Sequence, residues 1–152
     1  MREALEAARA LVARHDDLRI GYPVHPNPGV RAVACDVLGG VERVHLVPPL
    51  DYRCFAGLLS LAHLVLTDSG GVQEEAPSVG VPVLVLRDTT ERPEAVEAGP
   101  ARLVGTSAPQ IVAAASHLLG DRAAYEAMAR ASNPYGDGHA RVRIAVAIES
   151  RP

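Results

Sequence analysis

The sequence predicts a single α/β domain of the Rossmann-like class, a doubly wound parallel sheet with helices on both faces. Five short apolar stretches alternate with helical stretches along the chain, which is typical of consecutive βα units. Two of them, His63 to Thr67 and Val81 to Arg87, are almost unbroken apolar runs, as strands buried on both faces require. The length of 152 residues suits one such domain with a substantial core and is too short for two.

The first predicted element is an amphipathic helix from Arg2 to Arg14, with apolar side chains on one face. No Ser, Thr, Asp or Asn precedes it as an N-cap, so we expect the chain to enter this helix part-way, as a piece of a longer polypeptide would. A strand from Leu18 to Val24 follows. The next helix is expected to begin with Asn27 as its N-cap and Pro28 in the first helical position.

The following units repeat the order of strand, loop and helix. The expected pairs are strand Arg43 to Val47 with helix Tyr52 to Ala62, strand His63 to Thr67 with helix Val72 to Val79, strand Val81 to Arg87 with a helix beginning at Pro93, and strand Ala101 to Val104 with helix Ala108 to Leu119.

The end of the chain departs from this pattern. A helix from Asp121 to Ala131 is followed by the turn-rich stretch Asn133 to Gly138. A last helix then places Ile144, Ala147 and Ile148 on one side. This apolar side must cover a surface, either on this domain's own sheet or on a second domain.

The composition excludes several classes of function. All fifteen basic residues are Arg, so a P-loop and Schiff-base or pyridoxal phosphate chemistry are excluded. A net charge of -3 with scattered Arg residues argues against a nucleic-acid partner. Cys35 and Cys54 lack metal-ligand spacing, and we expect buried, reduced thiols and no metal. No apolar stretch reaches the roughly 18 residues of a membrane span, so we expect a cytoplasmic protein without a membrane partner.

The most informative loop is Asp68 to Gly71, which follows a predicted strand and leads into a helix. Ligands of open parallel sheets bind beyond the carboxyl ends of the strands. Gly70 and Gly71 allow close approach of the backbone, and the free amides and dipole of the helix favour an anion, so the loop suits a phosphate. An ordinary helix capped by Asp or Ser after a Gly turn explains the same pattern, and the pattern alone leaves both interpretations open.

Four further residues are candidate ligand contacts, each with an ordinary structural alternative. Glu75 could accept hydrogen bonds from a ribose diol, or simply favour the helix dipole. Arg92 could pair with a phosphate, or belong to a capped helix start. His25 could bond a base or sugar, or be polar surface, and Phe55 could stack on a base, or lie in the core. The chain has no Gly-x-Gly-x-x-Gly motif, which disfavours an ordinary NAD domain.

Four stretches together resemble the C-terminal domain of the non-hydrolysing bacterial UDP-N-acetylglucosamine 2-epimerases. They are Tyr22 to Pro28, Leu66 to Ser78, Leu86 to Ala95 and Asn133 to Gly138, and the middle two are long and specific. The resemblance runs from about Met1 to the end of the last helix. A small departure is Pro26, where a Leu is usual in the family.

The resemblance implies the C-terminal half of a two-domain fold like that of the B-type glycosyltransferases, with UDP in the cleft. The family interconverts UDP-N-acetylglucosamine and UDP-N-acetylmannosamine by eliminating UDP and adding it back, without metal or redox cofactor. By motif, Ser69, Gly70 and the adjoining Gly71 would hold the diphosphate. Glu75 would bind the ribose, Phe55 and Arg92 the nucleotide region, and His25 would line the cleft near the allosteric site.

The resemblance also implies a division of labour. Residues 1–138 would form the UDP-binding domain, and residues 139–152 a terminal helix that crosses toward an N-terminal domain. That domain carries the family's acid and base residues, so we expect no catalytic residue in this chain and no activity from it alone. The full-length protein would be a homodimer serving cell-surface polysaccharide synthesis. Two alternatives are the nucleotide-binding half of a B-type glycosyltransferase, which the Asp88 to Glu94 segment argues against, and a free-standing UDP-sugar-binding module.

Overall fold

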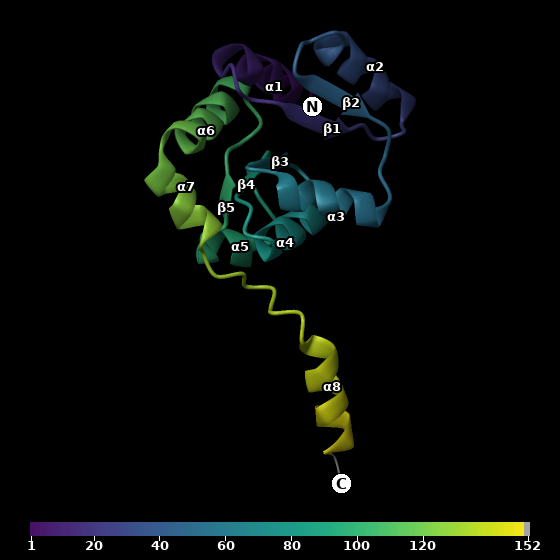
Figure 1. Cartoon of the computed structure of the whole chain (residues 1–152), viewed down its shortest axis with the longest axis vertical. Coiled ribbons are helices and arrows are strands. Elements are labelled where there is room, and N and C mark those ends of the chain that lie inside the picture. Colours follow the sequence, from purple (N-terminus) through teal and green to yellow (C-terminus); the bar gives the residue numbers. More distant parts are fainter. Residues whose placement is uncertain (151–152) are drawn as a thin grey trace.

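Helices and parallel strands alternate in the computed structural model, which describes residues 1–150 (Figure 1). The strands are β1 (Ile20–Pro23), β2 (Val44–Val47), β3 (Val65–Thr67), β4 (Val83–Val85) and β5 (Ala101–Leu103). The helices are α1 (Arg2–Arg14), α2 (Pro28–Leu38), α3 (Tyr52–Leu61), α4 (Gly70–Ser78), α5 (Pro93–Ala98), α6 (Ala108–Gly120), α7 (Arg122–Ala129) and α8 (Ala140–Glu149). The predicted order of elements and the α/β fold class are confirmed.

The strands form two parallel ladders, β1–β2 and β3–β4–β5, and not the one continuous sheet that we expected. The amides of Ile20 and Val24 donate to the backbone of the β2 segment, so the opposite edge of β1 presents Gly21 and Pro23. Pro23 has no N–H to donate. Pro23 therefore removes one of the amide donors that a further strand on this edge of β1 would need.

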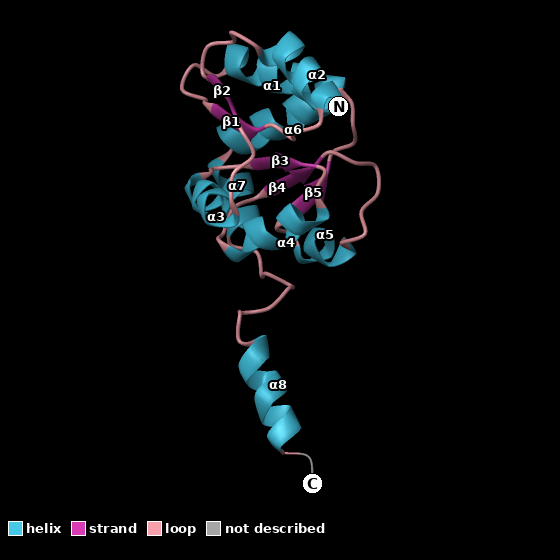
Figure 2. Ribbon diagram, turned by 90° about the vertical axis from the view of Figure 1, so that its right-hand side faces the viewer, coloured by secondary structure: helices cyan, strands magenta, loops and turns pink. Residues whose placement is uncertain are grey.

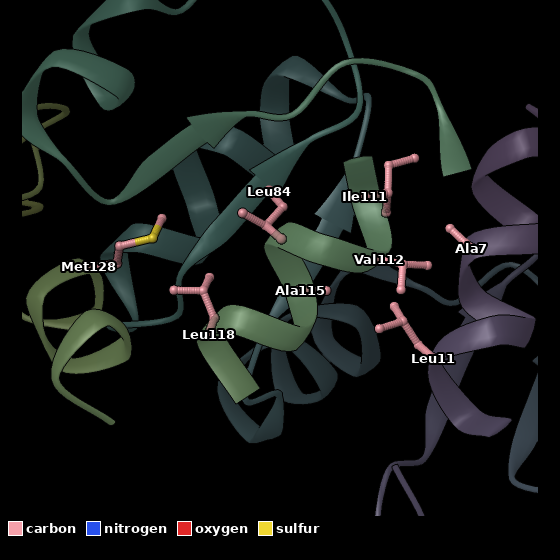
Figure 3. Close-up of a cluster of buried hydrophobic side chains, with 8 residues drawn as sticks. All are labelled: Ala7, Leu11, Leu84, Ile111, Val112, Ala115, Leu118 and Met128. Atoms are coloured by element: carbon pink, nitrogen blue, oxygen red, sulfur yellow. The ribbon is translucent and has the colours of Figure 1, made fainter. Parts of the chain in front are cut away.

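Strand β4 is the centre of the domain because it is buried on both faces. Its middle residue, Leu84, points into the cluster of buried side chains drawn in Figure 3, which α1, α6 and α7 complete. Its flanking residues, Val83 and Val85, belong to a second cluster formed with residues of α3, α4, α5 and β5. The unbroken apolar run of the sequence thus predicted correctly a strand covered on both sides.

Three helices begin with a side-chain cap that the sequence supplies. Asn27 accepts a hydrogen bond from the Gly29 amide at 2.8 Å, with Pro28 next to it, as predicted. Asp51 caps α3 and Asp121 caps α7 in the same manner. The first helix, α1, has no side-chain cap, which was also expected.

The Asp51 cap predicts how stability changes in acid. The hydrogen bond from the Cys54 amide holds the pKa of Asp51 below its usual range. Its contribution to stability is therefore complete above the unfolded pKa, about 3.9, and is lost as the pH falls through the lower folded pKa. Asp51→Asn keeps a capping oxygen that does not titrate.

We therefore expect wild type and Asp51→Asn to have similar urea midpoints at neutral pH, and the wild-type midpoint to fall more steeply below about pH 4. Circular dichroism measured during urea titrations over a pH series checks this. If the urea midpoints of wild type and Asp51→Asn changed in the same way down to the lowest pH, the Asp51 cap would not be coupled to protonation.

Both cysteines are exposed, free thiols, so the expectation that they would be buried was wrong. On α2 the buried side is formed by Ala34, Val37 and Leu38. Cys35 lies off this helical stripe and faces water. Cys54 lies in the first turn of α3, whose only buried residue in the described structure is Leu59.

The last helix, α8, projects away from the domain in both views (Figures 1 and 2). None of its residues is buried, and Val142, Ile144, Val146 and Ile148 are all exposed. The helix therefore does not cover this domain's own sheet. Residues 151 and 152, the end of the predicted terminal segment, lie outside the described residues.

A chain that ends at Gly138 should consequently be as stable as the longer one. The free energy of unfolding is expected to change by no more than about 0.5 kcal/mol, since no buried side chain of the described structure is removed. Urea unfolding of the two chains, followed by circular dichroism, makes the comparison. A clearly lower midpoint for the shorter chain would mean that α8 packs on the domain in solution.

Candidate nucleotide-binding site

The turn at residues 68–71 connects the carboxyl end of β3 to α4, where the sequence predicted an anion site. Ser69 is the N-cap residue, but its hydroxyl makes no capping hydrogen bond. Its amide donates to Thr67 Oγ1 at 3.0 Å. The amides of Gly70 and Gly71 donate no hydrogen bond to any of residues 1–150. The first turn of α4 thus offers two amide donors and one hydroxyl that have no partner among residues 1–150.

The two glycines of this turn differ in what the fold requires of them. A Cβ added to Gly70 would lie 3.2 Å from Glu91 Oε1, so an alanine there would require the exposed Glu91 side chain to shift slightly. A Cβ added to Gly71 would meet no atom closer than Ser69 Oγ at 4.0 Å. Alanine at position 71 would favour the helix by about 0.5–1 kcal/mol. Packing among the described residues, 1–150, therefore gives no reason for Gly71.

The loop between β4 and α5 lies against α4. Thr90 donates its hydroxyl to Gln73 Oε1 at 2.6 Å, and Arg92 pairs with Glu74. Within the loop, Arg87 pairs with Glu91 at 2.7 Å. These contacts bring together two segments that the sequence separates by an entire strand.

Arg92 has a protein partner in this structure. The hydrogen bond from its guanidinium to Glu74, and the charge of that carboxylate, raise the pKa of Arg92 above its ordinary value. Its positive charge is therefore balanced by Glu74. The sequence placed Arg92 near the turn correctly but did not reveal this pair, because the two residues are far apart along the chain.

The adjacent carboxylates Glu74 and Glu75 have different surroundings. Glu74 is held by Arg92, whereas the half-buried Glu75 carboxylate forms no hydrogen bond or ion pair within residues 1–150. Glu75 follows Gly71 by one helical turn, so both lie on the same side of α4. Of the two carboxylates, Glu75 is the one available to accept hydrogen bonds from a ligand.

The loop after β1 reaches the same end of the domain. The pKa of Tyr22, on β1, is raised by burial and by the negative charge of Asp68, the residue that follows β3. His25 is exposed, and its Nδ1 lies 3.2 Å from the Asn27 amide. Sequence reasoning quoted Tyr22 within a motif but did not identify it as part of this edge.

Two aromatic residues pack on the second core cluster. Phe55, a predicted base contact, is half-buried against it. Tyr135, which sequence reasoning did not single out, packs on the same cluster from the 133–138 turn. Burial raises the pKa of Tyr135, and its hydroxyl is buried without a hydrogen-bond partner in the described structure. The packing of Tyr135 thereby anchors the segment that leads to α8 on this cluster.

Two further observations concern residues 1–150 only. Their His, Cys, Asp and Glu side chains form no group of three or more that could hold a metal ion. None of their helices has the length and apolar character needed to cross a membrane.

Known proteins match this chain over almost its whole length. The sequence profile of the family described as UDP-N-acetylglucosamine 2-epimerase matches residues 1–149. A probable UDP-N-acetylglucosamine 2-epimerase of Ralstonia nicotianae is 59% identical over 97% of this chain and 40% of its own length. The UDP-N-acetylglucosamine 2-epimerase of Escherichia coli K12 is 53% identical over 97% of this chain and 39% of its own length.

Solved structures give the same result. A putative UDP-N-acetylglucosamine 2-epimerase from Listeria monocytogenes has a TM-score of 0.94 at 52% identity, covering 98% of this chain and 40% of that one. The Neisseria meningitidis UDP-GlcNAc 2-epimerase, bound to UDP-GlcNAc, has a TM-score of 0.92 at 43% identity, covering 99% and 40%. The chain thus spans about 40% of the length of the relatives it matches. It belongs to the UDP-N-acetylglucosamine 2-epimerase family.

Proposed function

We propose that this chain is the UDP-binding part of a UDP-N-acetylglucosamine 2-epimerase and that residues 69–71 hold the diphosphate. The observation that carries the proposal is Gly71, a helical glycine that packing does not require, beside amides that donate to no group in the part of the chain that the structure describes. A glycine there lets a ligand approach the backbone closely. Solved relatives bound to UDP-GlcNAc and to UDP support the choice of ligand.

The other predicted residues take roles that suit their chemistry. Glu75 accepts hydrogen bonds from the ribose hydroxyls, because its carboxylate has no protein partner within residues 1–150. Phe55 and Arg92 line the nucleotide region. His25 lines the cleft from the loop after β1. The diphosphate lies at the amino end of α4, where the helix dipole favours a negative charge.

The complete reaction needs more than this chain. We infer that the protein interconverts UDP-N-acetylglucosamine and UDP-N-acetylmannosamine by elimination and re-addition of UDP, and that a further domain supplies the acid and base. The extended α8 crosses to that domain with its exposed apolar side chains. We place the protein in the cytoplasm, as a homodimer that serves cell-surface polysaccharide synthesis.

Calorimetric titration of the purified chain with UDP and with uridine tests the binding proposal. UDP is expected to bind, and uridine to bind at least about tenfold more weakly, because it lacks the charged groups for the α4 amides. No heat with UDP, or equal affinities for the two ligands, would contradict the proposed diphosphate site. Formation of UDP-N-acetylmannosamine by the chain alone would contradict the division of labour.

A further inference from the structure

Gln73 is the only polar side chain in the described structure that is completely buried. Its Nε2 donates to the Ser69 carbonyl oxygen at 3.1 Å, and its Oε1 accepts the Thr90 hydroxyl at 2.6 Å. Thr90 Oγ1 in turn accepts the amide of Arg92 at 3.0 Å. One continuous chain of hydrogen bonds therefore runs from the turn after β3 to the loop after β4.

This arrangement uses a property that an apolar residue lacks. A carboxamide carries a donor and an acceptor at the same end, so it can satisfy a carbonyl oxygen and a hydroxyl together. Leucine would fill a similar volume without any cost of removing polar atoms from water. A buried, hydrogen-bonded polar network rigidifies its surroundings, whereas exposed ion pairs such as Arg87–Glu91 add little.

We propose that Gln73 is a positioning residue that sets the place of the 69–71 turn relative to the loop carrying Thr90 and Arg92. It does not touch the nucleotide. The Ser69 carbonyl oxygen accepts both the backbone amide and the side-chain amide of Gln73, and it lies in the same peptide plane as the Gly70 amide. By holding this peptide unit, Gln73 orients the Gly70 amide before the ligand arrives, so less ordering is needed on binding. The expected effect on UDP affinity rests on the proposed function. The role of Gln73 in holding the 69–71 turn and the loop with Thr90 and Arg92 together does not.

The test uses Gln73→Leu and Thr90→Val, which keep the shape and remove the hydrogen bonds, with Thr90→Ser as the variant that restores the hydroxyl. Ser78→Ala is the matched control, because it removes an exposed hydrogen bond from the opposite end of the same helix. Two quantities are measured for each protein: the hydrogen-exchange rate of the Arg92 amide by NMR, and the affinity for UDP by calorimetry.

Gln73→Leu and Thr90→Val are each expected to speed exchange at Arg92 and to weaken UDP binding, both by about tenfold. The double variant should resemble the single ones, because each breaks the same chain of hydrogen bonds. Thr90→Ser and Ser78→Ala should stay close to wild type. Should Gln73→Leu fail to fold, the UDP affinity of Thr90→Val decides whether the Gln73–Thr90 hydrogen bond matters, because Thr90→Val itself removes the acceptor of the Arg92 amide.

Wild-type affinity for UDP in both Gln73→Leu and Thr90→Val would overturn the positioning role, as would an equal loss in Ser78→Ala. Weaker binding with unchanged Arg92 exchange would also overturn it, since Gln73 would then act by another route. If the wild-type chain binds no UDP, the proposed function fails, and Arg92 exchange still decides whether Gln73 braces the two loops.

Discussion

Replacing Gly71 by Asp is expected to weaken UDP binding by about 100-fold or more, because it brings a carboxylate next to the bound diphosphate. Like charges about 4 Å apart near a protein surface repel by roughly 4 kcal/mol, which is ample for that loss. The fold should tolerate the change, since position 71 has open space and Asp is favourable in the first turn of a helix. Calorimetry gives the affinity and circular dichroism the stability.

Gly120→Asp is the matched control for this experiment. It makes the same substitution at the far end of α6, where an added Cβ meets no atom within 4 Å. It should leave UDP affinity unchanged. Equal affinity in Gly71→Asp and Gly120→Asp would show that the nucleotide phosphates do not lie against the first turn of α4.

Replacing Leu84 by Ala should lower the free energy of unfolding by about 3 to 5 kcal/mol, the range for a cavity left in a rigid core. Leu84 is completely buried at the middle of β4, among side chains of α1 and α6 (Figure 3). This loss is a large part of the roughly 5–15 kcal/mol that stabilises a typical domain. Urea unfolding of the purified variant measures it.

A Leu-to-Ala substitution at an exposed position is the control for Leu84→Ala. Leu61 is 86% exposed at the end of α3, so Leu61→Ala is expected to change stability by no more than about 0.5 kcal/mol. Similar losses in Leu84→Ala and Leu61→Ala would mean that β4 is not the centre of the core.

The fold could be predicted largely from local patterns. The apolar run of β4 and the Asn27–Pro28 start of α2 depend on neighbouring residues only, and both were correct. The split of the strands into two ladders was missed, because it depends on which edge of β1 Pro23 faces. The register in which β1 pairs with β2 decides which edge Pro23 faces, and the local sequence does not reveal this register.

The same distinction applies to the candidate site: its contiguous part could be predicted from the sequence, and its contacts between distant segments could not. The turn at residues 68–71 is contiguous, so its amides and glycines could be predicted from the sequence. The Thr90–Gln73 hydrogen bond and the Arg92–Glu74 pair join helix α4 to the loop after β4, and no spacing rule predicts them. Glu74 and Glu75 are equivalent in the sequence, and only the position of Arg92 distinguishes them.

The central claim is that the free amides of α4 receive the diphosphate, and NMR of the ¹⁵N-labelled chain during a UDP titration tests it most directly. The amide resonances of Gly70 and Gly71 are expected to shift more than those elsewhere, following one saturation curve that agrees with the calorimetric affinity. Saturable UDP binding that leaves both resonances in place, with the largest shifts at α1, α2 or the amino ends of the strands, would contradict the claim.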